Sequence, residues 1–188
     1  MKLPSHLQRP FFKVILGNDD IKALETWIYH EPSLEEFLSP DDYLTLIGLD
    51  FNDKKAVIEL EKLISPYLDF LTYYQNLLKQ TLSSLINNPD DFYKLSQIYD
   101  WYCQGYYFLR KLALTYGLSA DLSFCDESYQ NFQLSDDALA EIAQQALWLY
   151  DDLICQNIVL INPPSYDVNI DHFKDFRDDT QKVREDLL

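Results

Sequence analysis

Apolar residues recur every three or four positions along most of the chain, which is the spacing of amphipathic helices. The segments with this spacing are residues 21–31, 54–64, 66–86, 89–117, 135–156 and 169–188. Shorter helices are predicted after Ser33 and Ser39, which stand where helix N-caps are expected. The pattern predicts an all-α bundle of about seven helices, with three or four long ones packed antiparallel.

The segments between these helices are polar or contain proline. Residues 1–17 are expected to form an N-terminal arm, and residues 118–134 an acidic loop. Residues 45–51 and 157–161 are the only candidate strands, and both are short. A chain of 188 residues with such short connections is expected to form a single domain, residues 1–188.

The segment from Ile98 to Gly117 carries seven aromatic residues in twenty positions. On a helical wheel its apolar residues fill about half of the circumference, and Gly105 lies among them. This wide arc predicts a central helix whose aromatic side chains form the core. The alternative is a polar ligand pocket, in a small-molecule-binding protein or enzyme, lined by Tyr99, Tyr102 and Tyr106, because each buried hydroxyl needs a partner.

The net charge of −16 narrows the classes of partner. Direct binding of nucleic acid or of an anionic membrane is not expected, because both require clustered lysine and arginine. No apolar run reaches the roughly 18 to 20 residues that span a bilayer, and residues 1–18 lack the apolar run of a signal peptide. Three scattered cysteines without a CxxC pair favour a reducing compartment. We therefore expect a cytoplasmic protein.

No catalytic motif is recognisable. His6, His30 and His172 lie in no metal-binding pattern, and the sequence has no nucleophile elbow, glycine-rich phosphate loop or calcium loop. Adjacent aspartates recur, but several pairs directly follow the serine or proline at a predicted helix start, where capping explains them. The sequence thus predicts neither an enzyme nor a cofactor or metal.

Acidic residues are concentrated in the 62 positions between Lys111 and Lys174, which contain ten acids and no lysine or arginine. Within the helix predicted at 135–156, Trp148 projects away from the apolar stripe, among carboxylates. An exposed ring surrounded by acids is typical of an anchor for a basic partner, because burial of the ring gives affinity and the acids steer association. The predicted partner-binding residues are Trp148, Glu141, Asp151, Asp152, Asp136 and Asp137. The alternative is that another element, such as the helix predicted at 169–188, covers Trp148.

Residues 23–64 contain a W-I-Y helix end, an E-x-F-L-x-x-D-D-Y-L run, an L-D-F step and the segment A-V-I-E-L-E-K-L. With these features the segment resembles small acidic, helical immunity proteins of bacteria, which protect a cell from a toxin made by itself or its kin. The resemblance implies a helical fold and an immunity role, and it assigns no functional residue.

These observations lead to the expectation of a non-catalytic immunity or inhibitor protein. Its acidic face would occlude the basic cleft of a toxin, plausibly a nuclease, with carboxylates in the place of phosphate. A different class of function, a structural subunit, would form a homodimer through residues 169–188.

Overall fold

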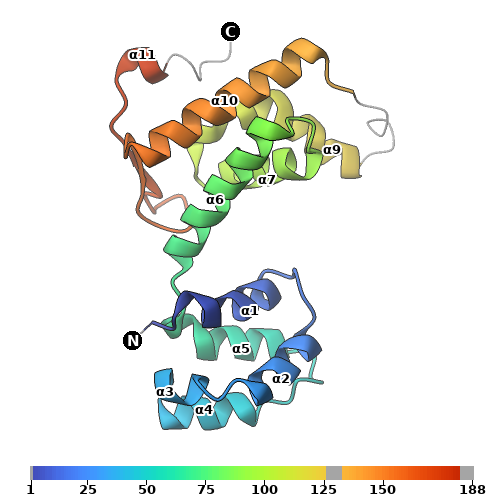
Figure 1. Cartoon of the computed structure of the whole chain (residues 1–188), viewed down its shortest axis with the longest axis vertical. Helices are drawn as coiled ribbons and strands as arrows, with labels where there is room; N and C mark the ends of the chain where they lie inside the picture. The colour runs from blue at the N-terminus through green and yellow to red at the C-terminus, as the bar shows by residue number, and fades with distance from the viewer. Residues whose placement is uncertain (1, 126–132, 183–188) are drawn as a thin grey trace. The chain divides into compact units, whose positions relative to one another are not determined.

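The computed structural model describes residues 2–125 and 133–182, and it is mostly α-helical (Figure 1). The single predicted bundle takes the form of two compact units, Met1–Phe70 and Leu71–Leu188, which we call the N-terminal and C-terminal units. Pro66, predicted to open a long helix, lies in a 3-10 turn (Ser65–Tyr67), and the long helix begins at Phe70. Each unit has its own buried apolar side chains.

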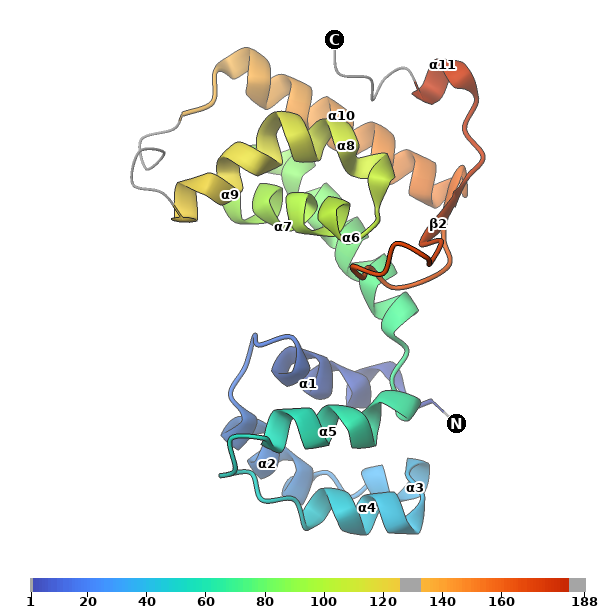
Figure 2. The ribbon, with the colours of Figure 1, turned by 180° about the vertical axis from the view of Figure 1, so that it is seen from behind.

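The N-terminal unit contains α1 (Ser5–Ile15), α2 (Ile21–His30), α3 (Leu34–Phe37), α4 (Pro40–Ile47) and α5 (Ala56–Ile64). Helix α1 packs against α2 and α5, and α4 packs against α3 and α5 (Figure 2). The cap predicted at Ser39 is confirmed: its side chain accepts a hydrogen bond from the Asp42 amide, with Pro40 at the first helical position. The cap predicted at Ser33 is not, because its hydroxyl donates to Glu31 and makes no hydrogen bond to an amide of α3. Helix α2, predicted at 21–31, begins at Ile21 and is capped by Asp20.

The prediction of an extended arm at residues 1–17 is wrong, because residues 5–15 form α1. Pro10 stands inside this helix, where it removes one backbone donor. Leu7, Phe11 and Phe12 of the same helix are almost completely buried. The free energy gained by burying these side chains outweighs the local cost of the proline. The sequence pattern of residues 1–17 does not show that they are buried, so it did not predict the helix.

The C-terminal unit contains the long helices α6 (Phe70–Asn87), α7 (Phe92–Cys103) and α10 (Asp136–Ile154), and the shorter α8 (Arg110–Leu112), α9 (Leu118–Cys125) and α11 (Asp179–Lys182). Helix α9 and the π-helical turn Ala113–Gly117 pack against α7, and α10 packs against α8 (Figure 2). The side chains between them form one continuous apolar core.

The predicted helix at 89–117 ends early, at Cys103. Gly105 adopts a φ of +100°, a left-handed conformation that reverses the chain, and α8 and α9 return along α7. The return is close: a Cβ on Gly117 would lie 2.7 Å from the carbonyl oxygen of Leu95 on α7. The aromatic segment is nevertheless core, as predicted, with Trp101, Tyr106 and Phe108 buried.

Two further expectations need correction. Residues 118–125 of the expected acidic loop form α9, whereas 126–132 lie outside the described residues. In place of the helix expected at 169–188, Phe173–Asp175 forms strand β2 and only Asp179–Lys182 is helical, while 183–188 lie outside the described residues. Strand β2 pairs antiparallel with β1 (Ile158–Leu160), and this pairing satisfies the β1 backbone and confirms the candidate strand at 157–161.

Candidate functional site

Three of the predicted partner-binding acids are exposed on α10. Asp136 and Asp137 lie in the first turn of the helix, directly after the Ser135 cap, and Asp151 lies near its end. The first two are placed to interact with the positive end of the helix dipole, which gives them a structural role of their own. All three carboxylates are accessible to a partner.

Glu141 already has partners within the chain. The hydroxyl of Tyr116 donates to its carboxylate at 2.6 Å, and the Lys111 ammonium lies 2.9 Å from the other carboxylate oxygen. The hydrogen bonds from Tyr116 and Lys111 lower the pKa of Glu141, while burial and the neighbouring carboxylate raise the pKa of Tyr116. Glu141 therefore ties α10 to the segment of residues 110–117.

Asp152 is buried, and Arg177 of the C-terminal segment lies against its carboxylate. Its carboxylate lies 3.7 Å from the guanidinium of Arg177 and accepts a hydrogen bond from the Asn157 amide at 3.0 Å. Trp148 is half-buried. A partner that used Asp152 would have to displace Arg177, so the described C-terminal segment covers part of the face predicted from the sequence.

The Glu141 contacts predict a specific acid sensitivity. A folded-state pKa below the ordinary 4.5 means that the ionised form adds stability above that pH, and that this stability is lost as the pH falls through the lowered value. We expect Glu141→Gln to lower the free energy of unfolding at about pH 7 by under about 1 kcal/mol, because the side chain is 42% exposed. Urea unfolding of both proteins between about pH 7 and pH 3 should show this difference shrinking towards zero. A difference that stays constant over this range would contradict the assignment.

The three tyrosines of the alternative ligand pocket do not share one cavity among those described below. Tyr106 is completely buried, and its hydroxyl donates to the Asn162 carbonyl at 3.2 Å. Tyr102 packs edge-on against Tyr107, and Tyr99 interacts with Cys103. Tyr106 therefore joins the core to the loop after β1, and its hydroxyl has a partner within the chain.

That loop, residues 161–172 between the two strands, is held in place by backbone and side-chain hydrogen bonds. The amide of Ser165 donates to the Gln104 carbonyl at 2.9 Å, and the side chain of Asn162 donates to the Asp171 carbonyl at 2.8 Å. Within the loop, Asp167 accepts two hydrogen bonds from Asn169, which lower the pKa of Asp167. The loop is thus fixed against the end of α7 and carries its side chains in a defined arrangement.

His172 anchors the end of the loop in the reversal at Gly105. Its Nδ1 donates to the Pro163 carbonyl at 2.7 Å, and its ring lies against the glycine so closely that a Cβ at position 105 would be 2.2 Å from His172 Cδ2. The other ring nitrogen, Nε2, is buried and has no hydrogen-bond partner among the described residues. The contact explains why glycine is required at this reversal.

A cavity of about 250 Å³ lies between the loop and the end of α7. Its lining includes exposed apolar side chains, namely Tyr107 (55%), Tyr166 (73%), Val168 (86%) and Ile170 (40%). Asp167 and Asp171 also line it, and among the described residues that line it there is no lysine or arginine. We call the surface formed by these six side chains the loop surface: Tyr107, Tyr166, Asp167, Val168, Ile170 and Asp171.

Sequence reasoning counted Asp167 and Asp171 among the clustered acids but did not single out the loop surface. A usable signal was the run Tyr166-Asp-Val-Asn-Ile170, which is separated by one serine from a proline pair. It places three apolar side chains in a segment that has neither helix nor strand to bury them.

Within residues 2–125 and 133–182, no group of three or more His, Cys, Asp or Glu side chains is arranged to hold a metal ion. The exposed cysteines Cys103 and Cys155 are free thiols. No helix in the same ranges combines the length and the apolar character needed to cross a bilayer. No family model, curated protein or solved structure matches the chain.

Proposed function

We propose that this chain is a non-catalytic binding protein that inhibits a basic protein partner, with the loop surface as the main contact. The observation that carries the proposal is the combination of four exposed apolar side chains and two carboxylates around one cavity. Exposed apolar side chains gathered in one place mark interaction sites, since a protein usually buries such groups.

The two kinds of side chain have different roles in such an interface. Tyr166, Val168 and Ile170 supply the apolar surface that a partner desolvates, and tyrosine is among the residues enriched at energetic hot spots. Asp167 and Asp171 surround this surface with negative charge, and the net charge of −16 extends the same field over the molecule. Such a field accelerates the approach of a basic partner and disfavours acidic ones.

The inhibition is steric and electrostatic, and it makes or breaks no covalent bond. A basic cleft that normally holds phosphate is filled by carboxylates and covered by the apolar side chains. Asp136, Asp137 and Asp151 on α10 are also exposed, and their charges add to the negative field that steers such a partner. The resemblance of residues 23–64 to bacterial immunity proteins supports the more specific form, in which the partner is a toxin such as a nuclease.

The test begins with the tagged chain purified from its native cells at low salt, followed by identification of the co-purified protein. For that protein we expect Tyr166→Ala to weaken binding by about 2 kcal/mol, or about 30-fold, because a central aromatic contact is lost. Asp171→Lys should weaken binding and reduce its salt dependence, because a steering carboxylate is replaced by a repelling ammonium. Binding is measured by surface plasmon resonance or calorimetry at two salt concentrations.

Two matched variants serve as controls. Tyr93→Ala removes another exposed tyrosine, and Asp90→Lys makes the same charge change at an exposed site. Tyr93 lies in the first turn of α7, about 15 Å along the helix from the Cys103 end that lines the cavity, and Asp90 lies two residues before the helix begins. Equal losses in the control variants, or an acidic protein as the co-purified partner, would count against the proposal.

A further inference from the structure

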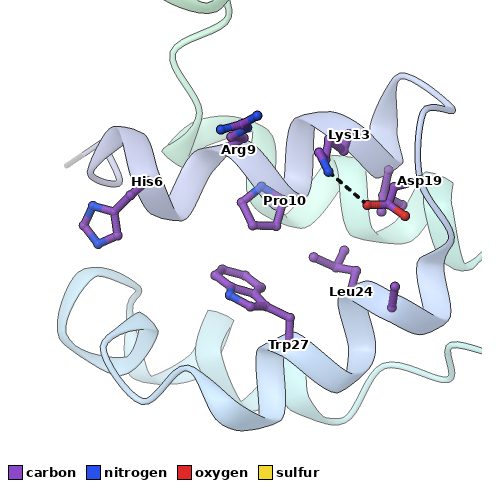
Figure 3. A pocket seen from close by; sticks show the side chains of 9 residues that line it. His6, Arg9, Pro10, Lys13, Asp19, Leu24 and Trp27 are labelled. Carbon is purple, nitrogen blue, oxygen red and sulfur yellow. Dashed lines mark hydrogen bonds and ion pairs between the residues drawn. The ribbon is translucent and has the colours of Figure 1, made fainter.

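A second cavity, of about 260 Å³, lies in the N-terminal unit between α1 and α2. Its electrostatic character is the opposite of that of the loop surface. Three side chains that carry or can accept positive charge, His6, Arg9 and Lys13, follow one another along α1 (Figure 3). Such a row is unusual in a chain with twice as many acids as bases.

The helical repeat of α1 explains why these side chains share an edge. Positions 6, 9 and 13 are separated by three and four residues, so they lie on one face, while Leu7 and Phe11 point into the core. All three basic side chains are exposed, and within the described part of the chain Arg9 and His6 have no side-chain hydrogen bond or ion pair. Lys13 has one contact, a 3.4 Å ion pair with Asp19, and exposed pairs of this kind are weak.

The floor of the groove is apolar. The indole of Trp27 lies opposite Pro10, with Leu24 beside it on α2 (Figure 3). The Trp27 ring meets Phe11 edge-on, with centroids 5.5 Å apart, and it remains half-buried. The contact with Phe11 fixes the ring, so that a bound apolar group could pack on it with little loss of side-chain freedom.

We propose that this groove binds an acidic peptide segment of a partner protein, with carboxylates on the row of basic side chains and an apolar side chain over Trp27. The row favours a peptide over a compact anion. From residue 6 to residue 13 the helix rises about 10 Å, so the three side chains begin over a length several times that of one phosphate group. An extended peptide rises about 3.3 Å per residue, so about four residues span the row and alternate carboxylates with apolar side chains.

This site is independent of the loop surface, which lies in the other unit and selects the opposite charge. The local positive charge also makes the binding selective. The net charge of the chain repels an acidic peptide elsewhere, and the repulsion is reversed at this groove, where three basic side chains lie beside a single carboxylate among the described lining residues, that of Asp19.

The probe is a fluorescein-labelled peptide with the sequence Glu-Phe-Glu-Leu-Glu, titrated with the full chain at low salt and followed by fluorescence anisotropy. We expect saturable binding that weakens as salt is added, and no saturation for the peptide with glutamine in place of each glutamate. Arg9→Glu should weaken binding at least about tenfold, since a charge-assisted contact becomes a repulsive one.

The matched control is Lys62→Glu, which makes the same change of net charge at an exposed position on α5 outside the groove. Circular dichroism checks that both variants fold. Absence of saturable binding, or an equal loss with Lys62→Glu, would overturn the proposal. It would also be overturned if inorganic phosphate or a mononucleotide bound in an Arg9-dependent manner and the peptide did not.

Discussion

Replacement of Arg177 by methionine is expected to lower the free energy of unfolding of the C-terminal unit by about 3–5 kcal/mol. Arg177 is only 5% exposed, and its guanidinium makes two hydrogen bonds to the Asp175 carboxylate, at 3.0 and 2.8 Å. It also lies 3.7 Å from the carboxylate of Asp152, which is itself 7% exposed. Methionine fills much of the same space but leaves a buried carboxylate without a cation, and that is the costly state.

The pKa of Asp175 is consistent with this role of Arg177. Partial burial by itself raises the pKa of Asp175, but the hydrogen bonds and the charge of Arg177 outweigh burial and hold the pKa below its usual value. A lowered folded-state pKa means that the ionised pair stabilises the unit at neutral pH and that the stabilisation is lost in acid. The Arg177→Met defect should therefore become smaller as the pH falls below the usual pKa range of aspartate.

The Arg177 effect is measured by urea unfolding in a Trp27→Phe background, where fluorescence reports only on Trp101 and Trp148 of the C-terminal unit. Lys174→Met is the control: it removes a cation from the exposed side of β2 and should change stability by less than about 0.5 kcal/mol. The double variant Arg177→Met with Asp152→Asn should recover part of the loss, because the second change removes the unpaired charge. A loss below about 1 kcal/mol in Arg177→Met would contradict the assigned role.

Substitution of Gly105 by alanine is the second change with a large expected effect, about 3 kcal/mol of lost stability. Two costs combine at this position. A φ of +100° is strained for any residue with a side chain, and the new Cβ would lie 2.2 Å from His172 Cδ2 and 2.8 Å from Nε2. Relief of the overlap requires His172 to move, and that movement would displace the loop of residues 161–172, which ends at His172 and carries most of the loop surface.

Two comparisons separate the costs at Gly105. Gly17 has a φ of +73°, and a Cβ added there would have no neighbouring atom within 4 Å. Gly17→Ala therefore measures backbone strain without overlap and should cost about 1 kcal/mol. The double variant Gly105→Ala with His172→Ala removes the overlapping ring and should be more stable than Gly105→Ala with His172 present. If the double variant is less stable by the full sum of both changes, the overlap is not the cause.

The sequence predicted the helical class and most helix starts because both depend on local features. Ser39, Asp91 and Ser135 each accept a hydrogen bond from an amide of the first helical turn, as their positions before an apolar periodic segment suggest. The C-terminal end of α7 and the existence of α1 were not predicted. Gly105 lies within a continuous apolar arc that does not indicate a helix end, and Pro10 lies within a short segment that does not indicate a helix. In both places packing between elements determined the local structure.

The candidate site shows the same division between local and long-range information. The exposure of Asp136 and Asp151 follows from the wheel of α10 alone. The partners of Glu141 and Asp152 do not, because Lys111 and Arg177 are 30 and 25 residues away along the chain. The loop surface depends on where the loop of residues 161–172, which has no helix or strand periodicity, contacts the rest of the unit. The hydrogen bonds that fix this loop involve Gln104 and Tyr106, which are distant along the chain.

The central claim, that the loop surface contacts a basic protein partner, is tested most directly by site-specific photo-crosslinking. A photoreactive phenylalanine analogue replaces Tyr166 in one variant and Tyr93 in a control; both native side chains are exposed, at 73% and 59%. The variants are irradiated in native cells, and the crosslinked proteins are identified. We predict that position 166 crosslinks one basic protein and that position 93 does not. Crosslinks of equal yield at the two positions, or none at 166 while the tagged chain still co-purifies with its partner, would contradict the assignment of the loop surface.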